Sequence, residues 1–158
     1  MSDRVPMTQA GYAKLQAEAK RLKSEERPAI VKEIETARAH GDLSENAEYH
    51  AAKEKQGQVE GRIRTVEDRL ARAQVIDPTG QSTDKVRFGH RVELEDADSG
   101  EQVSYTLLGE EEADAANGCI SVGSPVARAL LGKEVGDLVR VSVPRGTREF
   151  EILEILSS

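Results

Sequence analysis

The sequence is poor in cysteine and aromatic residues: its 158 residues include one Cys, no Trp, three Tyr and two Phe. A single cysteine excludes an internal disulfide framework and fits a reducing compartment. The N-terminus lacks the apolar segment of a signal peptide, and no run approaches the roughly 20 apolar residues of a membrane-spanning helix. We therefore expect a soluble, cytoplasmic protein with no membrane partner. So few aromatic residues are more typical of a helical rod than of a large globular core.

The net charge of −7 is distributed unevenly along the chain. Residues 1–76 contain 14 Lys and Arg against 13 Asp and Glu, whereas residues 77–158 contain 8 against 16. The acidity of the second half argues against non-specific binding of free nucleic acid by that half. The pattern of apolar residues changes near the same point of the chain.

The first part of the chain has helical periodicity. Thr8 is a candidate N-cap, and Gly41 is a candidate residue just beyond the helix end. Between them, apolar residues recur at helical spacing: Tyr12, Leu15, Ala19, Leu22, Ile30 or Val31, Ile34 and Ala37. The stripe is interrupted around Pro28, which has no N–H group and favours a kink.

A second helical stripe is more regular than the first. Its spacings alternate between three and four residues: Tyr49, Ala52, Gln56, Val59, Ile63, Val66, Leu70 and Ala73. Two long helices joined by a turn of a few residues must lie antiparallel. Residues 1–76 are therefore predicted to form a coiled-coil hairpin with an acidic tip at residues 41–45.

The second half of the chain changes to a period of two. Residues 77–84 contain Pro78 and Gly80 and are predicted to form a linker. Beyond it, apolar and polar residues alternate in four segments: 92–94, 103–107, 138–143 and 150–152. A short helix is expected to follow Ser124 as N-cap and Pro125 as first residue. Residues 85–158 are therefore predicted to form an antiparallel sheet covered by one helix, which makes the chain a two-domain α+β protein.

Two carboxylates, Asp42 and Glu45, fall at the predicted tip. One interpretation is structural, because residues 42–45 resemble a capping box that starts the second helix. The alternative is that the two acids share a divalent cation. Two monodentate carboxylates do not hold Mg²⁺ alone, so a partner's carboxylates or a substrate phosphate must complete such a site.

Other chemistry is sparse. His40, His50 and His90 have no Cys or His neighbour at zinc-ligand spacing, so we expect solvated or hydrogen-bonding imidazoles. Cys119 has no evident base and is interpreted as a packed thiol. No glycine-rich phosphate loop is present in the sequence.

Two segments carry a specific resemblance to a known family. The first is Gly41-Asp42-Leu43-Ser44-Glu45-Asn46-Ala47-Glu48-Tyr49 with its flanks out to residues 38 and 53. It resembles the tip signature of the GreA/GreB family of bacterial transcript cleavage factors. The second is the run from Ile120 to Lys133, and the similarity extends over nearly the whole chain. Leu43 and Glu48 are similar to the GreA branch of the family rather than the GreB branch.

The resemblance implies a mechanism. The hairpin is expected to enter the secondary channel of bacterial RNA polymerase, while the second domain, FKBP-like in the family, docks at the channel mouth. Asp42 and Glu45 would then help to hold a second Mg²⁺ beside the polymerase's own aspartates and orient the water that cleaves the nascent RNA 3′ end. The protein is thus expected to be no enzyme by itself, and to bind Mg²⁺ only weakly when free.

The resemblance also implies supporting roles for other residues. Ser44 and Asn46 would support the tip, and Arg38 and Lys53 would bind RNA phosphates. An ordinary solvated helix face explains Arg38 and Lys53 equally well. The expected polymerase-docking residues lie in the second signature: Ser121, Ser124, Pro125, Arg128 and Lys133.

Three other functions fit parts of the sequence. A relative that occupies the channel without supporting cleavage would act as an inhibitor. A prolyl isomerase would use the second domain, although an aromatic-lined pocket would have to come from Phe88, Tyr105 and Phe150 without any Trp. A plain coiled-coil adaptor would need only the capped tip.

Overall fold

The computed structural model describes residues 3–42 and 45–157, which form two compact units. We call them the hairpin unit, made of Asp3 and Tyr12–Ala73, and the sheet unit, made of Arg4–Gly11 and residues 74–157. Within residues 3–42 and 45–157, no helix is both long and apolar enough to cross a membrane.

The first arm of the hairpin contains two α-helices separated by a π-helical turn. α1 (Gln9–Arg21) leads into η1 (Leu22–Glu26), and α2 (Arg27–Arg38) follows. In the turn, the Arg27 N–H donates to the Leu22 carbonyl, five residues earlier. This extra residue lets Leu22 and Ile30, eight positions apart, both be buried. The predicted interruption is therefore a π turn, and Pro28 follows at the start of α2, where its missing N–H costs little.

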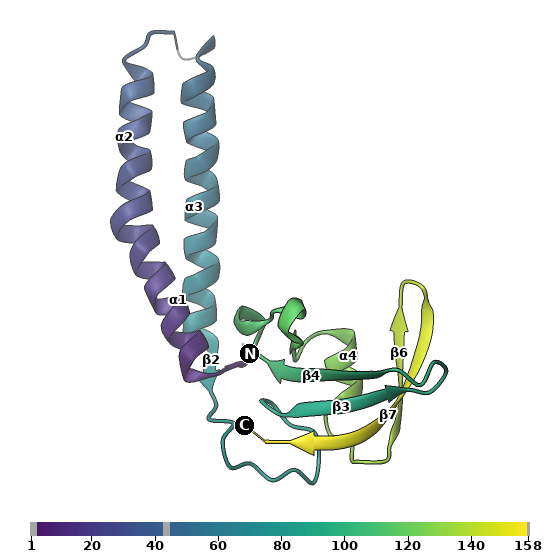
Figure 1. Cartoon of the computed structure of the whole chain (residues 1–158). Coiled ribbons are helices and arrows are strands. Elements are labelled where there is room, and N and C mark those ends of the chain that lie inside the picture. Colours follow the sequence, from purple (N-terminus) through teal and green to yellow (C-terminus); the bar gives the residue numbers. More distant parts are fainter. Residues whose placement is uncertain (1–2, 43–44, 158) are drawn as a thin grey trace. The chain divides into compact units, whose positions relative to one another are not determined.

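The second arm is one helix, α3 (Ala47–Arg72), which lies beside α2 in Figure 1. Ala52, Ile63 and Val66 are buried, and the other stripe residues from Tyr49 to Leu70 are half-buried. The antiparallel helical hairpin is thus confirmed. Ala73 was predicted to extend the helix, but its backbone is extended and it begins β2 (Ala73–Val75).

Ion pairs flank the apolar seam of the hairpin. Arg27 meets Glu60 through two bonds of 2.8 Å, and Arg62 meets Glu18 through two bonds of 2.7 Å. Lys55 lies 3.2 Å from Glu33 on an exposed edge. The exposed Lys55–Glu33 pair contributes little stability. The two bidentate Arg–Glu pairs join defined positions of the two arms and so fix their register.

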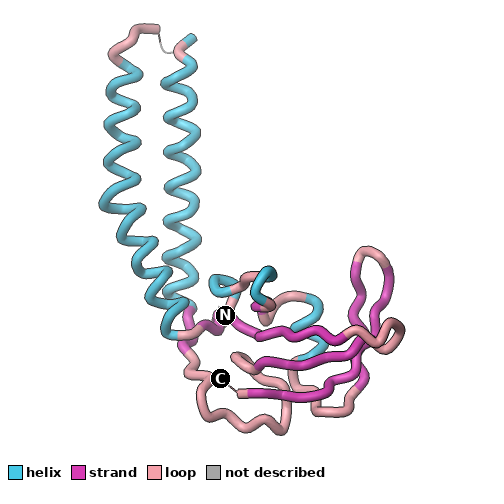
Figure 2. Tube along the Cα trace, viewed as in Figure 1, coloured by secondary structure: helices cyan, strands magenta, loops and turns pink. Residues whose placement is uncertain are grey.

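The sheet unit is built on five strands in the order β5-β4-β3-β7-β6. Figure 2 shows the strands in magenta. Their bounds are β3 Arg91–Asp96, β4 Gln102–Leu108, β5 Cys119–Ser121, β6 Leu138–Val143 and β7 Gly146–Leu156. All neighbours are antiparallel except β4 and β5. The sheet is therefore mixed rather than wholly antiparallel. The chain reaches β5 by a crossover through the 3₁₀ turns η3 (Glu110–Glu112) and η4 (Ala115–Asn117), which permits a parallel pair. A separate ladder joins β1 (Val5–Met7) to β2.

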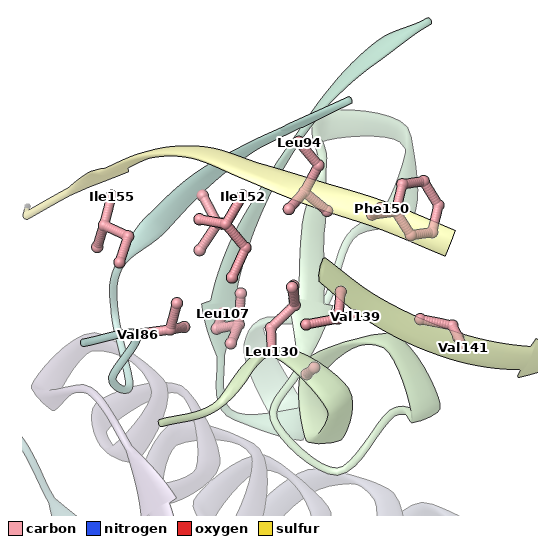
Figure 3. Packing of buried hydrophobic residues seen from close by; sticks show 11 residues of the cluster. Val86, Leu94, Leu107, Leu130, Val139, Val141, Phe150, Ile152 and Ile155 are labelled. Carbon is pink, nitrogen blue, oxygen red and sulfur yellow. The ribbon is translucent and has the colours of Figure 1, made fainter. Parts of the chain in front are cut away.

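The core of the sheet unit lies between the sheet and α4 (Pro125–Leu130). Figure 3 shows side chains from the strands and the helix meeting there. The cluster comprises Val86, Val92, Leu94, Leu107, Ala127, Leu130, Val139, Val141, Phe150, Ile152 and Ile155. Ser124 Oγ accepts a bond from the Ala127 N–H at 3.3 Å, which confirms Ser124 as the N-cap of α4.

Two polar side chains are buried in the sheet unit. His90 Nδ1 accepts a bond from the Arg87 N–H at 2.9 Å, while among the described residues Nε2 has no hydrogen-bond partner. Burial lowers the pKa of His90, and the Arg87 charge acts in the same direction. Asp96 accepts bonds from Arg148, at 2.6 Å, and from the main chain of the following turn. The Arg148 hydrogen bond is the main cause that lowers the pKa of Asp96.

Candidate functional site at the hairpin tip

The tip begins where α2 ends. Ala39 is the C-cap of α2, and the His40 N–H donates to the Ala37 carbonyl oxygen at 3.1 Å. Gly41 has a φ of +117°, a backbone conformation that L side chains rarely adopt. This turn leads away from α2 to Asp42, whose side chain is exposed. The sequence pattern predicted Gly41 as the first residue after the C-cap. Because Ala39 is the C-cap, Gly41 is the second residue after it.

The second acid, Glu45, is exposed and lies just before α3. The structure places the start of α3 after residues 42–45, where the capping-box interpretation expected the helix to begin. The N-cap of α3 is Asn46, whose Oδ1 accepts a bond from the Tyr49 N–H at 3.0 Å. Asn46 therefore caps α3, and the two acids precede this cap, near the positive end of the helix dipole. Leu43 and Ser44 lie outside the described residues, so the predicted support by Ser44 stays a prediction.

The donor set of the two acids decides what kind of metal site they fit. Within residues 3–42 and 45–157, no group of three or more His, Cys, Asp or Glu side chains could hold a metal ion. Mg²⁺ requires octahedral coordination by oxygen and usually keeps several waters beside one or two carboxylates. Asp42 and Glu45 therefore fit part of a shared Mg²⁺ site and do not fit a complete one.

The surroundings of the tip are polar and exposed. His40 Nδ1 lies 3.0 Å from Glu48 Oε2, and the two side chains are 55% and 71% exposed. The Tyr49 and His50 rings form an edge-on pair with centroids 5.5 Å apart. Tyr49 is half-buried, in agreement with a packing role in the seam.

The candidate RNA-binding residues lie on different helices. Arg38 is in the last turn of α2, and Lys53 is in the second turn of α3. Both are exposed, and Lys53 Nζ donates to Gln56 Oε1 at 3.0 Å. Their binding to RNA phosphates stays a prediction.

The candidate docking residues belong to the sheet unit and gather around α4. Pro125 and Arg128 are exposed on the helix, and Lys133 is exposed in the turn after it. Ser121 Oγ accepts a bond from the Gly123 N–H at 3.1 Å, and Ser124 caps α4. The two serine hydroxyls therefore have local structural roles, whereas Pro125, Arg128 and Lys133 present exposed side chains.

Sequence patterns missed two polar links across the tip. These are the His40–Glu48 pair and a bond of 2.6 Å from Asn46 Nδ2 to the Ala37 carbonyl oxygen. The signal that the sequence offered was an Asn at the start of the second stripe, since Asn is a strong N-cap residue. Its partner on α2, a main-chain carbonyl, has no sequence signature.

Comparison with known proteins supports the resemblance over both halves of the chain. The model of the family "Transcription elongation factor, N-terminal" matches residues 5–75. The model "Transcription elongation factor, GreA/GreB, C-term" matches residues 81–157.

Individual relatives agree with these family matches. The transcription elongation factor GreA of Rhizobium etli (strain CIAT 652) is 56% identical over 98% of both chains. That of Anaeromyxobacter sp. (strain K) is 60% identical over 96% of this chain and 92% of its own. Among solved structures, GreA factor homolog 1 of Thermus thermophilus is 32% identical, covers 96% of this chain and 98% of its own, and gives a TM-score of 0.45. The chain therefore belongs to the GreA/GreB family of transcription elongation factors.

Proposed function

We propose that this protein binds bacterial RNA polymerase in the cytoplasm, inserts its hairpin into the secondary channel, and stimulates cleavage of the nascent RNA 3′ end in backtracked complexes. The observation that carries the proposal is the position of Asp42 and Glu45. Both are exposed and both precede Asn46, the residue that caps α3.

The dimensions of the hairpin support delivery into a narrow channel. α3 has 26 residues, which at 1.5 Å per residue gives a length of about 39 Å. A pair of helices, each about 10 Å across, is thin for that length. Such a rod can bring a carboxylate to a distant reaction centre, but it has too little surface around its tip to enclose a substrate. The protein is therefore an activator of the polymerase's own cleavage activity rather than an enzyme by itself.

The tip acids would act by completing a site that the polymerase provides. Asp42 and Glu45 are the residues that would hold the second Mg²⁺ together with the polymerase's aspartates. When bound there, this ion would supply charge stabilisation for the attacking and leaving oxygens of the phosphodiester. The carboxylates themselves would orient the attacking water, since an ionised carboxylate only accepts hydrogen bonds. Ser44 is proposed to support the tip beside them.

Residues outside the tip would supply binding. Arg38 and Lys53 would contact phosphates of the extruded RNA. Pro125, Arg128 and Lys133, with Ser121 and Ser124 shaping the turns around them, would form the docking surface on the sheet unit.

The test is RNA cleavage in stalled, backtracked polymerase complexes with Mg²⁺ and saturating factor. Wild type should release short 3′ RNA fragments, and Asp42→Asn or Glu45→Gln should slow release by about 100- to 1,000-fold, which corresponds to about 3–4 kcal/mol of transition-state stabilisation. Competition between labelled wild type and each variant measures polymerase binding, which should be unchanged. A wild type that binds the polymerase without stimulating cleavage would contradict the proposal and indicate a channel-occupying inhibitor or an adaptor.

A further inference from the structure

Asn46 makes hydrogen bonds to both helices of the hairpin. Its Oδ1 accepts a bond from the Tyr49 N–H at 3.0 Å, and its Nδ2 donates to the Ala37 carbonyl oxygen at 2.6 Å. Its own carbonyl accepts the first main-chain bond of α3, from the His50 N–H at 3.1 Å. One half-buried side chain thus joins the last turn of α2 to the first turn of α3.

This link closes the loop that carries the two acids. Ala37 and Asn46 are nine positions apart, and both Asp42 and Glu45 lie between them. Glu45 directly precedes Asn46, so fixing Asn46 fixes the main chain from which the Glu45 side chain extends. A displacement of about 1 Å of a catalytic group can cost about 100-fold in rate, so the loop ends need such a constraint.

Two other features of the described residues at this end of the hairpin contribute little stability. The buried seam residues nearest the tip are Ala37 and Ala52, and alanine buries little apolar area. Both also line a shallow groove of about 460 Å³ along α2 and α3. The His40–Glu48 pair spans the same loop, but its side chains are 55% and 71% exposed. Pairs this exposed contribute little, so the His40–Glu48 pair is a weaker link than the half-buried Asn46 amide.

The choice of Asn at position 46 distinguishes a residue that joins the two helices from one that only caps α3. Ser, Thr and Asp cap a helix about as well as Asn. However, Asp has no donor when ionised, and Ser or Thr carries its donor and acceptor on one oxygen atom. The planar amide of Asn presents an acceptor to α3 and a donor to α2 at the same time. We propose that Asn46 is a positioning residue, which ties α2 to α3 so that Asp42 and Glu45 are held in the geometry that cleavage requires.

This inference rests on the proposed function, and its first test separates positioning from binding. Asn46→Ser keeps an N-cap acceptor and removes the donor to Ala37, while His40→Ala is a matched control that removes the exposed tie. In backtracked complexes, Asn46→Ser should lower the cleavage rate at saturating factor by about tenfold or more. Its half-saturating concentration should stay within about twofold of wild type, as expected when only transition-state interactions are lost. His40→Ala should match wild type in both quantities.

Two kinetic outcomes would overturn the proposal. One is a wild-type saturating rate for Asn46→Ser. The other is a loss that appears only as a raised half-saturating concentration, because that would make Asn46 a binding residue. Helix content by circular dichroism checks folding. If Asn46→Ser loses helix content, Asn46→Thr, which also keeps the cap, takes its place.

A second test uses the free protein without polymerase or metal. Backbone ¹⁵N relaxation at Asp42 and Glu45 should show lower order parameters in Asn46→Ser than in wild type and in His40→Ala. Equal order parameters in all three proteins would overturn the tie even if cleavage rates differed. If wild type fails to stimulate cleavage, the proposed function fails, but the relaxation data still decide whether Asn46 orders the tip.

Discussion

The two units of this protein are stabilised in different ways. In the sheet unit, eleven buried apolar residues form one cluster between the sheet and α4 (Figure 3). In the hairpin unit, the buried apolar residues lie along the seam between the helices. Those nearest the tip are two small residues, Ala37 and Ala52. Apolar burial therefore stabilises the sheet unit, whereas the hairpin next to the acids has little buried apolar area and is joined by polar links.

The largest expected effect comes from breaking the core of the sheet unit. Leu94 is fully buried, so Leu94→Ala should lower the free energy of unfolding by about 3–5 kcal/mol through reduced burial and a cavity. Hydrogen exchange, read by mass spectrometry on β3 and β7, should report the change. Helix α3 should keep its wild-type exchange rates. If exchange accelerates equally in α3 and in the strands, the two units are not stabilised separately.

A smaller effect is expected from the cations near the tip. Arg38→Ala combined with Lys53→Ala should weaken crosslinking of the extruded RNA 3′ end about tenfold at moderate salt. A plot of the logarithm of RNA affinity against the logarithm of salt concentration should become less steep. Its slope should change by about 0.7 for each RNA phosphate that the variant no longer neutralises. Lys55→Ala is the matched control, because Lys55 is an exposed cation on the same helix that pairs with Glu33 at 3.2 Å. Unchanged crosslinking in the double variant would contradict RNA binding by these residues and would favour the alternative of an ordinary solvated helix face.

The smallest expected effect is a pH dependence confined to the sheet unit. Because burial lowers the pKa of His90, the unfolded state binds a proton more readily than the folded state. The stability of the sheet unit should therefore be full above about pH 6.5 and decrease as pH falls below that value. The pKa of Asp96 is also lowered, so its contribution is lost only below about pH 4.

Denaturant unfolding between pH 7.5 and 5 measures this dependence. His90→Asn keeps an acceptor for the Arg87 N–H and removes the titration, so it should lose the slope even if its overall stability is lower. An equal slope in wild type and variant would assign the pH dependence to other groups.

Local patterns predicted most of the fold. The stripe from Tyr49 to Leu70 is helical because its three-four spacing can bury only one face, and the structure confirms that face. The Ser124-Pro125 start of α4 was predictable because each residue has a strong preference for its position. The strands of the sheet unit were predictable from alternation, since their inner faces pack on one core.

The features that the sequence did not reveal depend on interactions between distant residues. β5 has three residues, too few for alternation to be visible, and its parallel pairing follows from the crossover before it. The apolar stripes before and after Leu22–Glu26 differ in register by one residue. The π turn there contains one extra residue and so keeps both stripes on the same face.

At the tip, the pattern Asp42 to Glu45 competed with Asn46 as the helix start. Asn46 is the helix start in the structure. Besides capping α3, its side chain donates a hydrogen bond to the Ala37 carbonyl oxygen on α2, which residues 42–45 gave no reason to expect. The sequence therefore located the acids correctly just before the second helix, but the residue that caps this helix is Asn46.

The most direct test of the central claim is a Mg²⁺ titration of RNA cleavage in backtracked complexes. It would compare polymerase alone with polymerase saturated by wild type, Asp42→Asn or Glu45→Gln. If the tip acids complete a shared metal site, wild type should lower the Mg²⁺ concentration for half-maximal cleavage, and each variant should move it back toward the value for polymerase alone. The same Mg²⁺ dependence with wild type and with both variants would contradict the claim.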